Sequence, residues 1–439
     1  MSGRVLCTEL RRGAAGFLVV VLVLVAAALL TSRAPRLSGY NSWSSGWSAA
    51  AGEFTAWGIV LGPVAATVAA WVGARERRWG LTELLATTPR PRAHRGALTL
   101  TALGVAVVLG QLAGAVAYAL AVAPTSRHPR VDDLVVPALG VLGVLVATAW
   151  GWAVGRLVPR RLTAPLVGLA LYAVAGVLSY SAGALGYLSP LGHLPYGSYQ
   201  ELLPGIVPGY AVWLASIAAV VLVAVLAQRR RWALVPAATA ALAVTVLLLA
   251  QDSPDGYPTW ARTDPVAARQ VCTGDAPVVC VTREHEAFLA DVTPLARGVI
   301  AEMAPVVTVR GAQEDLRGDV PDGYLPLTNL QTSGAMFRPG LTDPDDVRFQ
   351  TVMQFVSMRC PLGPSDVPQD EVQTSFDLSY VAAGVLVPSL RPALGDYPPA
   401  QDATALRARL QDPAEARAWI GRYLDAVHGC DYAALERLR

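Results

Sequence analysis

Glu284-His285-Glu286 is the sequence feature that comes closest to a reactive cluster, because it places an imidazole between two carboxylates. Such groups could bind a metal ion or transfer a proton. No HExxH motif surrounds them, however. A single histidine between two glutamates at the start of a helix is typical of a solvent-facing surface. We therefore expect these three residues to be exposed and to bind no metal.

Other patterns that would indicate catalysis are absent from the sequence. Asp343, Asp345 and Asp346 lack the ligand spacing of an EF-hand and are typical of a turn. No G-x-S-x-G motif is present. All 35 basic residues are arginine, so the chain has no lysine for a P-loop. The sequence therefore predicts that this chain is not an enzyme and has no cofactor of its own.

Four of the five cysteines lie in the C-terminal part of the chain, at Cys272, Cys280, Cys360 and Cys430. An even number of cysteines is typical of disulfides formed in an oxidising compartment. A zinc site is the alternative, but the seven residues between the first two cysteines do not match the usual Cys-x₂₋₄-Cys spacing. Of the three possible pairings, we favour Cys272–Cys280 with Cys360–Cys430.

The composition indicates a membrane protein. The chain has 439 residues, of which 53% are hydrophobic and 15% are charged, whereas about 25% of residues are charged in soluble domains. Residues 1–251 contain 19 arginines and seven acidic residues, a net charge of +12. Residues 252–439 contain 16 arginines and 26 acidic residues, a net charge of −10. This asymmetry indicates two parts in different environments.

Seven stretches without Asp, Glu or Arg are long enough to cross a bilayer, which takes about 20 apolar residues. They are Gly13–Ser32, Phe54–Ala74, Gly96–Ser126, Leu134–Gly155, Leu162–Gln200, Leu202–Gln228 and Trp232–Gln251. The fifth could hold two crossings, but Pro190, His193 and Pro195 favour a surface loop over residues 189–200. Because no charged residue lies in mid-span, a carrier driven by an ion gradient is disfavoured.

The placement of arginine predicts the orientation in the membrane. Fifteen arginines precede the first span or lie in alternate loops, and only four lie in the other loops. The arginine-rich side is expected to be cytoplasmic. With an uncleaved first span and seven crossings, the N-terminus lies inside and the C-terminal part lies outside. This agrees with the oxidising compartment that the cysteines indicate.

We therefore predict a polytopic α-helical membrane protein of about seven spans over residues 1–251. A small, disulfide-containing α+β extracytoplasmic domain follows over residues 252–439. Its expected strands and helices are Pro277–Val281, Glu284–Ala304, Val306–Val309, Ala403–Leu410 and Pro413–Val427. Residues 311–344 are rich in Gly, Pro and Asp and are typical of a loop.

Two GxxxG patterns in the spans, Gly110–Gly114 and Gly151–Gly155, allow helices to approach each other closely. Packing within one bundle is the favoured role. Contact between two copies of the chain is the alternative.

The loop between the second and third spans has the most informative motif, Arg75-Glu-Arg-Arg-Trp-Gly-Leu-Thr-Glu-Leu-Leu-Ala-Thr-Thr-Pro89. Leu81, Leu84 and Leu85 share one helical face, and Pro89 ends the helix. A short amphipathic helix between arginine clusters can rest on anionic lipids or insert into the groove of a partner. A plain arginine-rich loop is the alternative.

This motif resembles the first cytoplasmic loop of ABC-2-type transporter permeases, which typically reads Glu-Arg-Glu-x-Gly-Thr-Leu-Glu-Leu-Leu-x-x-x-Pro. In that family the segment is the coupling helix that meets a separate ATPase subunit. Arg75 lies beside the matching residues, which are Glu76, Gly80, Glu83, Leu84, Leu85 and Pro89. Leu81-Thr82 reverses the usual Thr-Leu order. The resemblance covers roughly residues 1–230, and the C-terminal part is similar to that of actinobacterial permease-like proteins.

The resemblance implies the permease subunit of an ABC exporter in a bacterial plasma membrane. ATP and Mg²⁺ would then bind to the partner ATPase, and the chain would form a homodimer or pair with another permease in the lipid bilayer. No nucleic-acid partner is expected. Spans without charge favour an apolar or amphipathic substrate. The alternative is a membrane-anchored receptor or scaffold whose outer domain binds an extracellular ligand without transport, and a membrane-bound hydrolase is less favoured.

Overall fold

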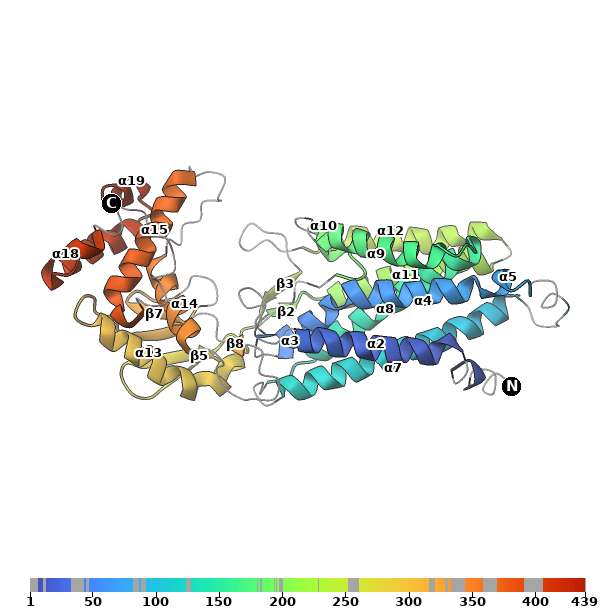
Figure 1. The fold of residues 1–439 in the computed structure, drawn as a ribbon, viewed down its shortest axis with the longest axis horizontal. Coiled ribbons are helices and arrows are strands. Elements are labelled where there is room, and N and C mark those ends of the chain that lie inside the picture. Colours follow the sequence, from blue (N-terminus) through green and yellow to red (C-terminus); the bar gives the residue numbers. More distant parts are fainter. Residues whose placement is uncertain are drawn as a thin grey trace. The chain divides into compact units, whose positions relative to one another are not determined.

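The computed structural model divides the chain into two compact units, unit 1 (Met1–Pro265) and unit 2 (Val266–Arg439) (Figure 1). The structure describes residues 7–10, 13–32, 43–44, 47–81, 87, 92–123, 128–179, 181, 184–192, 194, 196, 200–227, 229–251, 260–315, 320–327, 331–332, 344–357, 369–390 and 406–438.

Unit 1 is a bundle of apolar helices. Its elements are α2 (Ala14–Ser32), β1 (Trp43–Ser44), α3 (Trp47–Ala56), α4 (Gly58–Gly73), α5 (Arg75–Arg78), α7 (Arg92–Val122), α8 (Asp132–Leu157), α9 (Thr163–Ser179), α10 (Ala184–Tyr187), β2 (Gln200–Leu202), α11 (Ile206–Leu226), the 3₁₀ helix η2 (Arg230–Ala233), α12 (Leu234–Leu249) and β3 (Ala261–Thr263). Helices suit a bilayer because each satisfies its own backbone hydrogen bonds.

Five helical stretches of the described chain are long and apolar enough to cross a membrane. They are Ala50–Gly73, Ala93–Leu120, Asp132–Leu157, Ile206–Leu226 and Arg230–Leu249. Two further apolar helices, Ala14–Leu30 and Thr163–Ser179, are shorter. Each of the seven predicted spans overlaps one of these helices. The structure thus supports a membrane protein and does not by itself confirm seven crossings.

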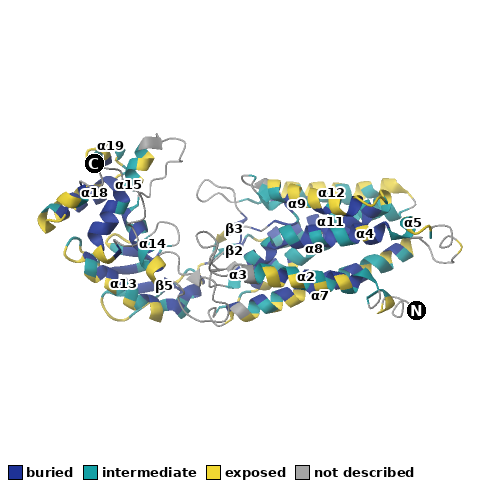
Figure 2. Ribbon diagram, viewed as in Figure 1, coloured by how far each residue is buried: buried dark blue, intermediate teal, exposed yellow. Residues whose placement is uncertain are grey.

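Many residues on the helices of unit 1 are exposed or only partly buried (Figure 2), and large apolar residues are common among the exposed ones. Five such residues are more than 60% exposed and come from four different helices: Phe17, Leu24, Leu120, Val177 and Leu242. A soluble monomer rarely exposes so many large apolar residues. In a bilayer the same surface contacts lipid tails.

The GxxxG patterns pack helices of unit 1 against one another. A Cβ atom at Gly151 or Gly155 on α8 would collide with the carbonyl oxygens of Ala66 or Ala70 on α4. A Cβ atom at Gly110 on α7 would collide with the side chain of Leu22 on α2. The patterns therefore act within one bundle, which is the role that we favoured.

The boundary between the units lies beyond the predicted position at residues 251/252. Strand β3 pairs antiparallel with β2, so the chain after α12 remains part of unit 1. Arg130 Nη1 donates to the carbonyl oxygen of Gln200 (2.8 Å) and to Asp264 Oδ2 (2.9 Å). Trp260 is fully buried, and its Nε1–H donates to the carbonyl oxygen of Leu247 (3.0 Å). These contacts attach residues 260–264 to unit 1.

Unit 2 is an α+β unit whose four-stranded sheet has the order β4-β5-β6-β7. Its elements are β4 (Gln270–Cys272), β5 (Val278–Thr282), η3 (Arg283–Phe288), α13 (Leu289–Met303), β6 (Gly311–Glu314), β7 (Tyr324–Leu327), β8 (Gln331–Thr332), α14 (Pro344–Val356), α15 (Gln369–Leu386), η4 (Pro388–Leu390), α18 (Pro413–His428) and α19 (Tyr432–Glu436). Strands β4 and β5 are antiparallel, whereas β6 is parallel to both β5 and β7. Apolar residues from sheet and helices form one core.

Some predictions for the C-terminal part were wrong. Residues 306–309 form no strand; the strand follows them as β6, which includes the buried Ala312. Strand β7 also lies within the predicted loop, because Leu325 and Leu327 are buried against the helices. The two-residue strand β8 lies in this region as well, so the predicted loop contains three short strands among its glycines and acidic residues. Helix α14 (Pro344–Val356) was not predicted.

Cys272 and Cys280 form a disulfide, as predicted. The two residues are directly opposite each other on the antiparallel strands β4 and β5. Cys430 is also disulfide-bonded. Its predicted partner Cys360 lies outside the described residues, so that pairing stays a prediction. Cys7 is free and exposed.

Candidate functional site

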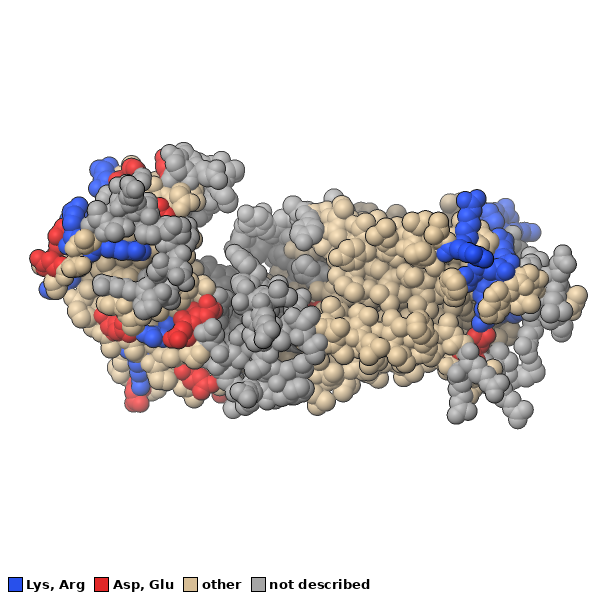
Figure 3. Space-filling view, viewed as in Figure 1, with Lys and Arg blue, Asp and Glu red and all other residues tan. Residues whose placement is uncertain are grey.

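Arginine side chains gather at one end of unit 1, and the neighbouring surface of the bundle carries no charge (Figure 3). We call this the arginine-rich end. It contains α5 and the last turn of α8 with Arg156. The predicted coupling loop begins here, directly after α4.

Gly80 ends the helical part of this loop. The Gly80 N–H donates to the carbonyl oxygen of Arg77 (3.3 Å) and the Leu81 N–H donates to that of Glu76 (3.0 Å). This pair of bonds is the Schellman motif, which needs a left-handed residue after the helix. Gly80 has φ +66°, and no atom of the described residues lies within 4 Å of where its Cβ would be. The backbone conformation alone therefore favours glycine at this position.

Two ion pairs fix the start of the loop to other parts of unit 1. Arg75 Nη2 lies 3.1 Å from Glu9 Oε1 in the short helical segment before α2. Arg156 Nη1 at the end of α8 lies 3.5 Å from Glu76 Oε2. All four side chains are between 19% and 31% exposed. These ion pairs therefore connect α5 to the segment before α2 and to α8.

Arg78 extends back along α4. Its guanidinium lies 3.6 Å from the centroid of the Trp71 ring, and its Nη2 donates to the Trp71 carbonyl oxygen (2.7 Å). Trp71 and Trp79 are more than half exposed. Arginine stacked on exposed tryptophan is typical of the membrane–water interface, where aromatic side chains are enriched.

The remaining predicted loop residues, Glu83, Leu84, Leu85 and Pro89, lie outside the described residues. The amphipathic coupling helix therefore stays a prediction. The structure brings Arg75, Glu76 and Gly80 together as the base of that loop. It also identifies Glu9 and Arg156 as their partners, which sequence reasoning missed because both lie far from the motif in the chain.

The arginine-rich end carries arginine side chains from α5 and from the end of α8. In the described parts of the chain, no group of three or more His, Cys, Asp or Glu is placed to hold a metal ion. Three arginines occupy the single turn of α5, which follows α4 after Ala74, and cations are favoured at the C-terminal end of a helix by its dipole. The result is a structured, positively charged surface suited to an anionic partner.

A second polar cluster lies inside unit 2 around His285. His285 Nδ1 lies 2.5 Å from Glu314 Oε1, and both side chains are 7% exposed. Glu314 Oε2 accepts a hydrogen bond from the Thr282 backbone N–H (2.6 Å). The prediction of an exposed Glu284-His285-Glu286 cluster was wrong, because Glu284 and His285 are buried. The partner Glu314 lies on β6, in the region predicted as a loop, so local spacing could not reveal it.

Burial and pairing shift the pKa of His285, and likewise that of Glu314, in opposite directions. Burial alone would lower the pKa of His285, but the charge and hydrogen bond of Glu314, together with the charge of Glu284, raise it overall. Burial alone would raise the pKa of Glu314, but the charge and hydrogen bond of His285 and the bonds from Thr282 lower it. Both shifts in pKa therefore favour the ionised form of the pair.

Comparison of this chain with protein-family models, curated proteins and solved structures found no match.

Proposed function

We propose that this chain is the membrane subunit of an ABC-type exporter and couples ATP hydrolysis by a separate ATPase to movement of an apolar or amphipathic substrate. The observation that carries the proposal is the base of the loop between α4 and α7. There a Schellman motif at Gly80 and the ion pairs Glu9–Arg75 and Glu76–Arg156 join the loop to two other elements of the bundle. A coupling element needs this kind of mechanical connection.

In this proposal the bundle crosses the bacterial plasma membrane seven times, with the arginine-rich end in the cytoplasm. Helices α2 and α9 cross together with the five longer ones. Unit 2 then lies outside the cell, where its disulfides form. The chain pairs with a second permease subunit, and ATP and Mg²⁺ bind to the ATPase.

Coupling would proceed through the loop. Closure of the ATPase on ATP would push the segment that contains Glu83, Leu84 and Leu85, and the ion pairs would pass this motion to α8. The resulting shift of the helices would change the accessible side of the substrate path. Because Glu76 is already paired with Arg156, we assign it to transmission of the movement and assign Glu83 and Leu84 to contact with the ATPase.

A receptor or scaffold without transport is the second candidate, and the independent core of unit 2 favours it. A unit with its own sheet, helices and disulfide can bind an extracellular ligand without help from the bundle. In this alternative the membrane helices serve as an anchor.

The test is affinity purification of the full chain from native membranes in mild detergent, with mass spectrometry of the proteins that accompany it. We expect a stoichiometric P-loop ATPase. The double variant Glu83→Arg/Leu84→Arg should lose it. The matched control Val158→Arg/Leu162→Arg changes exposed residues of the neighbouring loop between α8 and α9 and should retain it. Repeated recovery of the folded chain without any ATPase would refute the proposal and favour the receptor.

A further inference from the structure

The 3₁₀ helix η2 (Arg230–Ala233) lies between the end of α11 and the start of α12. A Cβ atom on Gly96 would lie 2.9 Å from Leu226 Cδ2 and 3.0 Å from Trp152 Cη2. The end of α11 therefore meets the start of α7 and the last part of α8. Because α8 ends at the arginine-rich end, the residues that follow α11 belong to the same end of unit 1.

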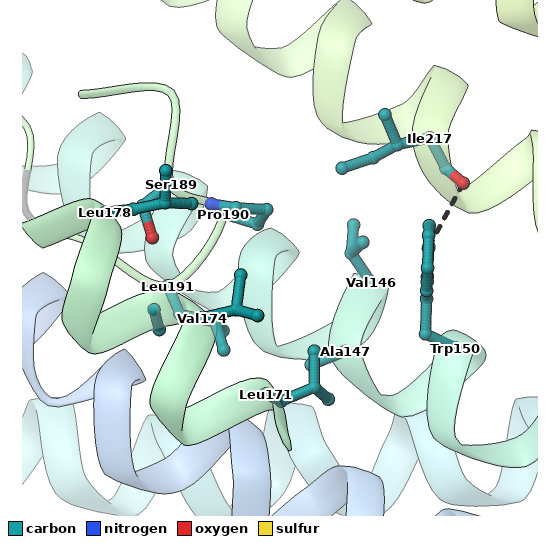
Figure 4. Close-up of a pocket in the computed structure, with 11 residues that line it drawn as sticks. Val146, Ala147, Trp150, Leu171, Val174, Leu178, Ser189, Pro190, Leu191 and Ile217 are labelled. Carbon is teal, nitrogen blue, oxygen red and sulfur yellow. Dashed lines mark hydrogen bonds between the residues drawn. The ribbon is translucent and has the colours of Figure 1, made fainter. Parts of the chain in front are cut away.

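Helix α11 itself is uncharged along its whole length. It is attached to α8 by the Trp150 Nε1–H, which donates to the Ile217 carbonyl oxygen (3.2 Å) beside a cavity with no charged residue in its lining (Figure 4). The first charged residue after α11 is Arg229. A change from an uncharged helix to consecutive arginines is expected where a span leaves the hydrocarbon layer.

Arg229, Arg230 and Arg231 carry a concentrated positive charge. All three residues are exposed. Within the described chain, their side chains form no ion pair or hydrogen bond with another residue. In contrast, Arg75 and Arg156 at the same end each pair with a glutamate. The described residues therefore leave the charge at η2 without neutralisation.

Large apolar residues adjoin these arginines. Trp232, Leu234 and Val235 are 58%, 72% and 59% exposed. The buried residues of α12 are Ala243 and Leu247, so the first two turns of this helix bury none. An exposed tryptophan between arginines and an apolar helix is typical of the membrane–water interface.

The occupant of this surface has to match both its charge and its apolar part. Guanidinium groups bind phosphate through charge-assisted hydrogen bonds. A phospholipid combines a phosphate with acyl chains, whereas an acidic protein surface would leave Trp232 and Leu234 without an apolar partner. A headgroup of net negative charge is favoured over a zwitterionic one, because the latter adds an ammonium group that arginine repels.

We propose that Arg229, Arg230 and Arg231 bind the phosphate of an anionic phospholipid whose acyl chains lie along the exposed start of α12. The site uses charge and apolar surface together, as basic segments beside membrane spans do when they bind anionic lipids. Binding requires only that unit 1 lies in a bilayer, so it is independent of transport and of an ATPase.

The test uses the full chain in nanodiscs of phosphatidylcholine with a small fraction of phosphatidylglycerol that carries a diazirine near the ester of one acyl chain. After irradiation, peptide mapping should place adducts on residues 229–240. Phosphatidylcholine with the same label should modify this segment much less. Arg230→Gln/Arg231→Gln should lower labelling by about fivefold for each arginine removed, and high salt should weaken labelling of the unchanged chain.

The matched control is Arg160→Gln/Arg161→Gln, which removes two exposed arginines from the loop between α8 and α9. It should leave the labelling of residues 229–240 unchanged. Arg230→Lys/Arg231→Lys keeps the charge and should retain most of the labelling. Unchanged hydrogen exchange in α11 would show that each variant is folded.

Equal labelling of residues 229–240 by the two phospholipids would overturn the proposal, as would full labelling of Arg230→Gln/Arg231→Gln. An acidic partner protein is the competing occupant. If the glutamine variant lost a copurifying ATPase but kept the preference for phosphatidylglycerol, the arginines would serve that protein and the lipid site would be refuted. Specific labelling in a chain that recovers no ATPase would retain the lipid site and reject the exporter.

Discussion

Replacement of Glu314 should reverse the pH dependence of stability around His285. In the unchanged protein Glu314 accepts from His285 Nδ1 and from the Thr282 N–H, and both partners are buried. Glu314→Ala leaves the two donors without an acceptor, and breaking a buried pair in this way costs roughly 3–5 kcal/mol. Glu314→Gln keeps an acceptor for Thr282 and loses the charge, which costs about 1.5–3 kcal/mol.

The sign of the pH effect follows from the two pKa shifts. The pKa of His285 is raised above 6.5 in the folded state, so its contribution is full below pH 6.5 and is lost as the pH rises through the raised value. The pKa of Glu314 is lowered below 4.5, so its contribution is full above pH 4.5 and is lost as the pH falls through the lowered value. The pair therefore stabilises unit 2 most between pH 4.5 and 6.5.

In Glu314→Gln the main cause that raises the pKa of His285 is gone. Burial, which is the largest effect on this group, then lowers its pKa in spite of the remaining charge on Glu284. Stability should now rise as the pH increases through the lowered pKa of His285 toward 6.5, whereas in the unchanged protein the contribution of the pair falls as the pH passes the raised pKa. The difference between the two proteins is one of direction, so it does not depend on the size of either shift.

Hydrogen exchange of the full chain in nanodiscs would measure this effect, with protection followed in residues 278–288 and 311–315 and corrected for intrinsic exchange at each pH. Glu415→Gln is the matched control, since Glu415 forms an exposed pair with Arg409 that should contribute little. Parallel pH profiles for the unchanged protein and Glu314→Gln would refute the assignment of a buried ion pair.

Three further perturbations test other parts of the structure. Gly80→Ala should destabilise the helical turn that ends at this position by roughly 1–2 kcal/mol, because it forces an L-residue into the left-handed region. The expected result is faster hydrogen exchange at residues 76–81. Gly80→Asn should increase the exchange rate less. Arg130→Met removes charged hydrogen bonds from Asp264 and should cost about 1.5–3 kcal/mol, seen as faster exchange at residues 260–264 with unit 2 unaffected. Replacement of Cys272 and Cys280 by serine opens a short loop and should cost about 2–3 kcal/mol, measured by the thermal unfolding of unit 2 and absent in Cys7→Ser.

The apolar helices of unit 1 could be predicted from the sequence because each one corresponds to a single continuous stretch of apolar residues. The same holds for the disulfide between Cys272 and Cys280, whose eight-residue separation suits two adjacent antiparallel strands. The strands β6 and β7 could not be predicted. Each has four residues, and its burial comes from helices elsewhere in the chain.

The polar contacts were the least predictable part, for a related reason. Glu314 is 29 residues from His285, and Asp264 is 134 residues from Arg130. The local sequence around a charged residue does not distinguish a side chain that faces water from one that pairs with a residue far away in the chain. The sequence therefore favoured exposure for His285, and only the folding of β6 beside β5 showed the pair.

The same limit changes the interpretation of the coupling motif. From the sequence alone, Arg75 and Glu76 would be interpreted as exposed side chains available to a partner protein. In the structure, both side chains form ion pairs with distant residues of unit 1. Because these pairs are partly exposed, each contributes little to stability. Their role in the proposed function is therefore to connect the loop to the bundle rather than to stabilise the fold. The first residues of the motif are thus held by ion pairs to the bundle. Under the proposed function, this is the reason to assign them to transmission of movement rather than to contact with an ATPase.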